Sequence, residues 1–87
     1  LELLSDMKLF LGVDGGGSGT RAVVFSDTYQ VLGRGEAGAS NHYVAGLEAA
    51  SQNCRIACEA ALEDTKRIEP NLRREDIAAW GFGLAGV

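Results

Sequence analysis

Five glycines fall within the eight residues from Gly12 to Gly19, and this cluster constrains the fold more than any other feature of the chain. The run before it, Lys8–Val13, is apolar and ends in a β-branched residue, which is typical of a buried strand. The run after it, Thr20–Phe25, predicts a second strand. The glycines therefore form a short connection between two strands, and only antiparallel neighbours can be joined so tightly.

Two common phosphate-binding motifs do not fit this cluster. The dinucleotide fingerprint G-x-G-x-x-G, started at Gly15 and Gly17, would need a glycine at position 20, where the chain has Thr20. The Walker A loop needs Gly-Lys-Ser or Gly-Lys-Thr, and the nearest lysine is Lys8, upstream of the glycines. Both motifs also need a helix after the loop, whereas a strand is predicted here. The sequence therefore predicts a strand–loop–strand hairpin.

A glycine-rich hairpin can still bind phosphate. Without side chains, successive backbone amides can point into one concavity that suits an anion, and Ser18 and Thr20 add hydroxyl donors. Asp14 at the strand end would repel phosphate directly, so its carboxylate indicates a divalent cation in between, held through water as Mg²⁺ prefers. The alternative is a hairpin turn whose glycines satisfy geometry only. Such a turn needs one or two glycines, and the four between Asp14 and Thr20 favour a magnesium–nucleotide site.

A third strand is predicted after this hairpin. It covers Val31–Ala37 and follows a turn at residues 27–30. Gly33 and Gly35 within it indicate a bulge or a close approach of another backbone. Because both connections are short, the three strands should form an antiparallel meander.

A helix and a fourth strand complete the predicted α/β order, β-β-β-α-β. From Leu47 the apolar residues recur at steps of three and four, which predicts a helix that ends before Pro70. Its predicted buried face consists of Leu47, Ala50, Cys54, Ala57, Ala61, Thr65 and Ile68. One further helical turn is expected within residues 72–76. The apolar run Ala78–Leu84 then predicts a strand covered on both faces and paired in parallel, with Trp80 in the core.

The composition excludes several classes of protein. Eighty-seven residues hold at most one domain, and 12 acidic against 8 basic residues give a net charge of −4. The longest basic run is Arg73-Arg74, so no nucleic-acid partner is expected. No apolar stretch reaches the roughly 20 residues of a membrane span, and the N-terminus lacks the basic start of a signal peptide. We therefore expect a cytoplasmic protein with no membrane partner, in which residues 1–7 are a tail or upstream remnant and residues 8–87 fold.

The cysteines and the paired acids carry no predicted chemistry. Cys54 and Cys58 lie four residues apart, with neither the C-x-x-C spacing of a redox motif nor the further ligands of a zinc site. They are expected as small apolar residues on one helix face, in a reducing compartment. Asp27 lies in a predicted turn and Glu63-Asp64 on the predicted solvent face of the helix. Arg21 either reaches a phosphate or is solvated, and the sequence leaves both open.

The segment from Gly12 to Thr20 resembles the first phosphate motif of the actin/hexokinase/Hsp70 superfamily: an apolar strand, Asp-x-Gly, a nearby Thr or Ser, and a second strand. Within that superfamily the triple glycine is similar to the BadF/BadG/BcrA/BcrD ATPase family, which includes N-acetylglucosamine and glucosamine kinases. The run Ala39–Tyr43 resembles the Ser-x-Asn-His-aromatic loop of the N-acetylglucosamine kinases, and Gly83–Gly86 resembles the segment that closes their fourth strand. The resemblance covers residues 8–87.

This resemblance implies a fold, a reaction and a set of site residues. The fold is a ribonuclease H-like lobe of an actin-like ATPase, incomplete in this chain. The reaction is transfer of the γ-phosphate of ATP to the 6-hydroxyl of N-acetylglucosamine or glucosamine, with Mg²⁺ held by Asp14 through water. Asn41 would bind a sugar hydroxyl, His42 would contact sugar or support the loop, and Tyr43 would pack. The β- and γ-phosphates would be wrapped by Gly15, Gly16, Gly17, Ser18, Gly19 and Thr20.

The catalytic base of such kinases is an aspartate after the fourth strand, so it is expected beyond Val87. The chain is then an N-terminal piece that is inactive alone, cut from a full-length protein that could form a homodimer. One alternative within the family is the ATPase activator of a 2-hydroxyacyl-CoA dehydratase or benzoyl-CoA reductase. Another is a non-catalytic nucleotide-binding module. The segment Asn41-His42 favours the sugar kinase, because it has no evident role in the activator.

Overall fold

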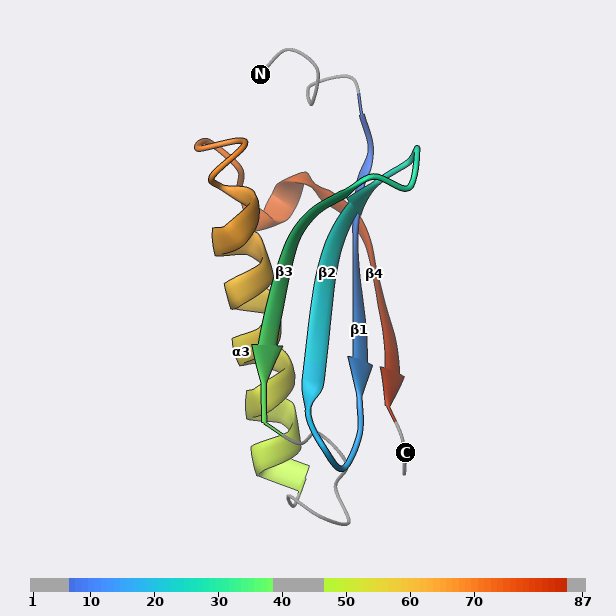
Figure 1. Cartoon of the computed structure of the whole chain (residues 1–87), viewed down its shortest axis with the longest axis vertical. Helices are drawn as coiled ribbons and strands as arrows, with labels where there is room; N and C mark the ends of the chain where they lie inside the picture. Colours follow the sequence, from blue (N-terminus) through green and yellow to red (C-terminus); the bar gives the residue numbers. More distant parts are fainter. Residues whose placement is uncertain (1–6, 39–46, 85–87) are drawn as a thin grey trace.

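The computed structural model describes residues 7–38 and 47–84. The described elements follow the predicted order (Figure 1). Three strands come first, and they are joined by short connections. A long helix, a single 3₁₀ turn and a fourth strand then follow. Their bounds are β1 Leu9–Gly15, β2 Thr20–Ser26, β3 Val31–Ala37, α3 Leu47–Thr65, η1 Arg74–Asp76 and β4 Ile77–Leu84.

The four strands form one mixed sheet in the order β3-β2-β1-β4. Strand β2 pairs antiparallel with both β1 and β3, which confirms the meander. Strand β4 pairs parallel with β1, which confirms the predicted crossover through the helix. The first strand therefore lies inside the sheet, and its end carries the glycine cluster between two neighbours.

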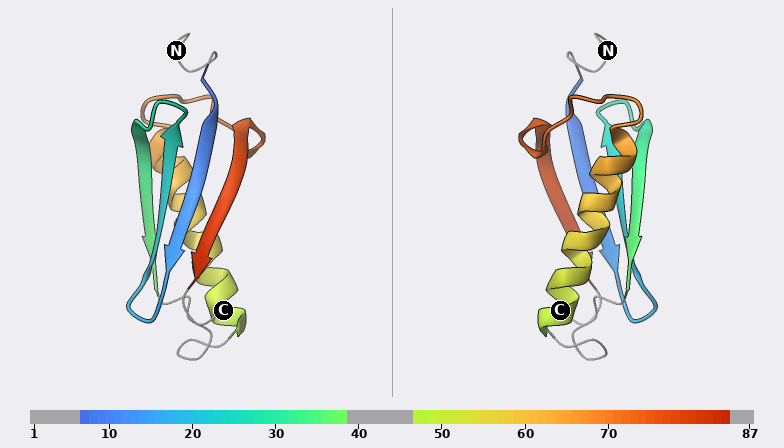
Figure 2. Two further views of the ribbon diagram at one scale, coloured as in Figure 1. Left: turned by 90° about the vertical axis from the view of Figure 1, so that its right-hand side faces the viewer. Right: turned by 90° about the vertical axis from the view of Figure 1, so that its left-hand side faces the viewer.

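The helix covers one face of the sheet and leaves the other open, as the two side views show (Figure 2). Successive residues on a strand point to opposite faces, so alternate positions of β1 and β2 enter the core beneath α3. The helix lies mainly over β3 and β2. The resulting core consists of Leu9, Leu11, Val13, Ala22, Val24, Leu32, Ala57, Cys58, Ala61, Leu62, Leu72 and Ile77.

The two glycines of β3 allow α3 to approach the sheet closely. A Cβ atom at Gly33 would lie 2.7 Å from the carbonyl oxygen of Ala61, and one at Gly35 would lie 2.7 Å from the Cβ of Ala60. Real Cβ atoms essentially never come so near, so only glycine fits at both positions. The β2–β3 register also shifts between Val24 and Phe25, which is a bulge. The predicted close approach is confirmed at both glycines, and the register shift lies beside Gly33 only.

Several details of the helix differ from the prediction. It ends at Thr65, before Pro70 as predicted, but Ile68, expected on the buried face, lies beyond the helix and is 40% exposed. Thr65 is the last helical residue and packs beside Gly33 of β3, and residues 66–68 form a turn. The buried stripe is also wider than predicted, because it includes Leu62, and Cys58 is buried beside it as a small apolar residue. The steps of three and four residues counted from Leu47 pass over both positions, so the spacing did not include them in the buried face.

Strand β4 was expected to be covered on both faces, and in this structure it is not. Ile77 is buried, but Phe82 is 54% exposed and Ala78 and Ala79 are exposed. Trp80, expected in the core, is half-buried and packs against its margin. The physical reason is that α3 lies over the opposite half of the sheet, so no described element covers β4.

Candidate functional site

The glycine turn is a tight connection between β1 and β2. Gly15 and Thr20 form the last pair of the ladder, and the amide of Gly16 donates a hydrogen bond to the carbonyl oxygen of Gly19 at 3.0 Å. The tip, Gly17 and Ser18, is exposed. Within residues 7–38 and 47–84, no acceptor is bonded to the amides of these two tip residues. The turn therefore presents free N–H groups and one exposed hydroxyl to solvent.

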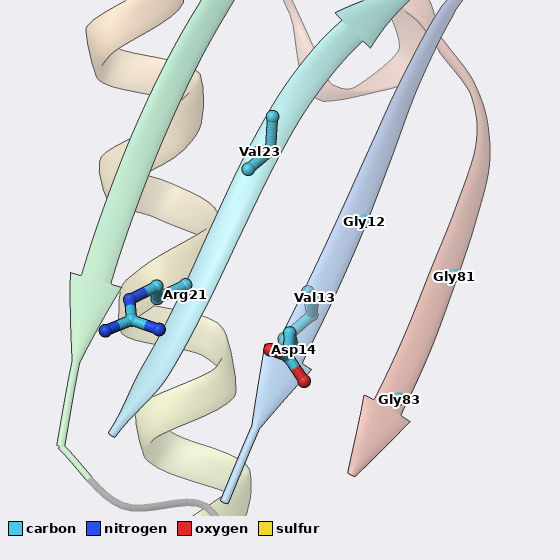
Figure 3. A pocket seen from close by; sticks show the side chains of 7 residues that line it. All are labelled: Gly12, Val13, Asp14, Arg21, Val23, Gly81 and Gly83. Atoms are coloured by element: carbon cyan, nitrogen blue, oxygen red, sulfur yellow. The ribbon is translucent and has the colours of Figure 1, made fainter. Parts of the chain in front are cut away.

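Asp14 stands beside this turn on the open face of the sheet. Its side chain is exposed and projects away from α3 (Figure 3). It lies at the edge of a shallow depression of about 500 Å³ that runs over β1, β2 and β4. Much of the floor is bare backbone, since three of the lining residues are glycines. The lining residues are Gly12, Val13, Asp14, Arg21, Val23, Gly81 and Gly83.

Asp14 is at one end of a row of charged residues across three strands. It is paired in register with Arg21 of β2, and Arg21 is paired with Glu36 of β3. Arg21 is exposed and forms no ion pair within the described residues. The guanidinium is therefore a free cation one strand away from Asp14, on the same face (Figure 3). The sequence left open whether Arg21 reaches a phosphate or is solvated. The pairing of Arg21 with Asp14 could have been predicted from the length of the turn between their strands.

Thr20 has a different environment from the rest of the predicted phosphate site. It is 1% exposed, and its position in β2 places it on the face covered by α3, whereas Asp14 lies on the other face. Its hydroxyl donates to the carbonyl oxygen of Gly38 at 2.6 Å. The fold thus brings Asp14, the glycine turn and Ser18 to one end of the sheet, and directs the hydroxyl of Thr20 into the protein.

The residues predicted to bind sugar, Asn41 and His42, lie outside the described residues, as does Tyr43. In the ranges 7–38 and 47–84, no three His, Cys, Asp or Glu side chains gather as a metal cluster. A single exposed carboxylate such as Asp14 does not suit a metal that needs many protein ligands. It does suit Mg²⁺, which keeps several waters and takes one or two carboxylates.

A sequence model of one protein family matches most of the chain. The model of the BadF/BadG/BcrA/BcrD ATPase family matches residues 11–87. The chain belongs to this ATPase family. The matched range begins inside β1 and includes the glycine turn and Asp14, so the family assignment rests on the same residues as the candidate site.

A solved structure has the same fold as this member of the ATPase family. It comes from Chromobacterium violaceum and has been provisionally assigned as an N-acetylglucosamine kinase. The two share 20% sequence identity, with a TM-score of 0.61 over 90% of this chain. The fold is therefore the predicted lobe of an actin-like ATPase. The chain spans 35% of the length of that protein.

Two further findings concern this family member. No curated protein sequence matches the chain significantly. Of the helices in the described ranges, none is long and apolar enough to cross a membrane.

The helix cysteines of this family member are part of the packing. Cys58 is buried and Cys54 half-buried, and both contact the core. Burial raises the pKa of the Cys58 thiol, and the neighbouring Cys54 raises it further. A raised pKa keeps the thiol protonated and unreactive, which agrees with the prediction that these residues act as small apolar side chains.

A second polar cluster lies at the other end of the helix, and the sequence analysis missed it. Arg74 of η1 donates from Nη1 to Oε1 of Glu59 at 2.7 Å, and its guanidinium lies 5.5 Å from the ring centroid of Trp80. These contacts tie η1 and β4 to the helix. Glu59 and Arg74 lie 15 residues apart in the sequence, so no local pattern indicated their contact. The cluster is structural and is not part of the candidate site.

Proposed function

We propose that the full-length protein is an ATP-dependent kinase that transfers the γ-phosphate of ATP to the 6-hydroxyl of an amino sugar, N-acetylglucosamine or glucosamine. In this proposal residues 8–87 are the N-terminal part of the ATPase domain and supply its first phosphate-binding element. The observation that carries the proposal is the exposed Asp14 beside a glycine turn with free amides, in a chain of this ATPase family.

The turn and Asp14 would bind the magnesium–nucleotide together. The β- and γ-phosphates would accept hydrogen bonds from the backbone amides of Gly17 and Ser18 and from the hydroxyl of Ser18, which are exposed at the tip of the turn formed by residues 15–19. Asp14 would hold Mg²⁺ through its waters, because phosphate and carboxylate repel each other without a cation between them. When bound, Mg²⁺ neutralises charge on the phosphates. The protein residues orient the nucleotide at the end of the sheet.

The sugar would be bound by the segment that follows β3. Asn41 would hydrogen-bond a sugar hydroxyl, since its amide offers a donor and an acceptor to a group that is also both. His42 would contact the sugar or support Asn41. The motif Ser40-Asn41-His42 and the fold shared with the provisionally assigned kinase support this choice of acceptor.

The acceptor hydroxyl needs a base, and we assign that role to none of the residues at 7–38 and 47–84. In the described part of the chain, Asp14 is the only carboxylate that lines the open depression. It is already assigned to the cation, so we place the base beyond Val87 in the full-length protein. The 87-residue chain alone should then bind nucleotide weakly and transfer no phosphate.

A direct test measures ADP release by the purified full-length protein with MgATP and a panel of sugars. Stimulation by N-acetylglucosamine or glucosamine, with a sugar 6-phosphate identified by ³¹P NMR, is the expected result. ATP hydrolysis that no sugar stimulates, in a brown and oxygen-sensitive preparation, would instead indicate the dehydratase or reductase activator. Absence of nucleotide binding at micromolar protein and millimolar ATP would reject both.

A further inference from the structure

The hydroxyl of Thr20 joins two segments that are distant in sequence. Thr20 is the first residue of β2 and directly follows the glycine turn. Its partner in the ladder is Ala37, the last residue of β3. The bond from Thr20 Oγ1 to the carbonyl oxygen of Gly38, at 2.6 Å, extends this pairing one residue beyond the end of the strand. Thr20 therefore fixes the point at which the chain leaves the sheet toward residue 39.

Two properties argue against a phosphate as the partner of this hydroxyl. A threonine has one hydroxyl proton, and here Gly38 accepts it. The residue is also 1% exposed and lies on the helix side of the sheet, whereas Asp14 faces the open side. The exposed hydroxyl of the turn belongs to Ser18. The chemistry of a phosphate ligand thus fits Ser18 and not Thr20.

The position of Gly38 is also constrained from its other side. A Cβ atom there would lie 3.2 Å from Nδ2 of Asn53 in α3, a tighter contact than nine in ten real Cβ contacts. Gly38 is exposed but lies beside Asn53 of α3, with its carbonyl oxygen bonded to Thr20. Removal of the hydroxyl would leave a partly buried carbonyl oxygen without this donor, which is unfavourable.

We propose that Thr20 is a positioning residue that couples the phosphate turn to the acceptor-binding segment, and does not itself bind phosphate. Residues 39–46 begin directly after Gly38, and Asn41 is three residues beyond it. This inference rests on the proposed function for the identity of the acceptor. Loss of this bond removes an anchor from the start of the acceptor segment, whereas the turn stays held by the Gly15–Thr20 pair and by the bond from Gly16 to Gly19.

The test compares Thr20→Val, Thr20→Ser and Thr28→Val in the full-length protein. Thr20→Val keeps the shape and removes the hydroxyl, so the KM for the amino sugar should rise about fivefold, the size expected for one lost hydrogen bond, while the KM for ATP stays unchanged. Thr20→Ser should restore the sugar KM. Thr28→Val makes the same chemical change in the β2–β3 turn, at the opposite end of the sheet, and should alter neither constant. A rise in the KM for ATP, or no change in the KM for the sugar, overturns the proposal.

Hydrogen exchange separates this inference from the proposed function. In nucleotide-free protein, Thr20→Val should accelerate exchange in the peptide that covers residues 37–46, and Thr20→Ser and Thr28→Val should not. Unchanged exchange in Thr20→Val overturns the positioning role whatever reaction the protein catalyses. If wild-type protein transfers no phosphate to any sugar but the exchange result holds, the choice of substrate is wrong and the positioning role stands.

Discussion

Asp14 and Thr20 border the same glycine turn, but strand alternation sends their side chains to opposite faces of the sheet. The two residues can therefore have different roles, one toward a ligand and one within the protein. Asp14 is exposed and has no hydrogen bond to hold it within the described chain, so it can serve a ligand. We expect Asp14→Asn, which keeps the shape and removes the charge, to weaken MgATP binding by about tenfold or more, since hydrogen bonds to charged groups contribute about 1.5–3 kcal/mol.

Isothermal titration calorimetry of the full-length protein checks this expectation, once with Mg²⁺ and once with EDTA. The loss should appear only with Mg²⁺. Asp27→Asn is the matched control, because Asp27 is an exposed aspartate in the turn at the opposite end of the sheet. If Asp14→Asn binds MgATP as the wild type does, Asp14 does not hold the cation.

Cys58 provides a prediction that depends on pH. Burial raises the pKa of its thiol, with a further contribution from Cys54, so the folded protein binds its proton more tightly than the unfolded chain does. The resulting stability is complete below the pKa of a free thiol, about 8.5, and declines as pH rises through the higher folded value. We therefore expect urea unfolding to show falling stability above about pH 8.5, and Cys58→Ala to flatten that decline. An equally steep decline in the variant would assign it to other groups.

Iodoacetamide labelling gives an independent readout for the same residue. Cys54 is half-buried and Cys58 buried, so mass spectrometry should find Cys54 modified first in the folded protein. In denaturant the two should react at similar rates. Preferential modification of Cys58 would contradict the buried position.

At the scale of elements, the sequence predicted most of the sheet and less of the helix. All four strands and both pairing modes were predicted, because strand patterns and short connections act locally. The predicted bounds of Val31–Ala37 agree with β3 to the residue. The helix ends before Pro70 as predicted, but the exposure of Ile68 and of β4 was not predicted, since it depends on where α3 lies over the sheet. In the candidate site, the glycine turn and Asp14 could be predicted because they are adjacent in the sequence. The bond from Thr20 to Gly38 could not, because it joins the start of β2 to the residue after β3.

The contact between α3 and β3 rests on Gly35. Gly35→Ala would place its Cβ 2.7 Å from the Cβ of Ala60, and still closer to backbone atoms of α3, so helix and strand would have to separate. We expect a loss of about 1–3 kcal/mol in stability, typical of an overpacked core. Gly81→Ala is the matched control, because no atom lies within 4 Å of a Cβ built there. Chemical denaturation measures both, and equal stability of the two variants would show that α3 does not pack on β3 this closely.

At the scale of the whole molecule, the two edges of the sheet are protected unequally. The edge formed by β3 carries the charged residues Arg34 and Glu36, and Oδ2 of Asp64 accepts a hydrogen bond from the amide of Arg34 at 2.8 Å. A helix side chain thus occupies part of that edge. The edge formed by β4 has the sequence IAAWGFGL, which contains no charge, and Phe82 on it is 54% exposed. Uncharged and exposed edge strands tend to pair with other chains.

The isolated 87-residue chain should therefore self-associate through β4. Phe82→Lys should shift it toward monomer, because a charged side chain on an edge strand opposes pairing between copies. Tyr29→Lys makes the same kind of change in the β2–β3 turn, where Tyr29 is 85% exposed and belongs to no strand, and should leave association unchanged. Sedimentation velocity over a dilution series distinguishes the three chains. A monomeric wild-type chain at every concentration, or equal effects of the two substitutions, would mean that the bare edge of β4 does not drive association.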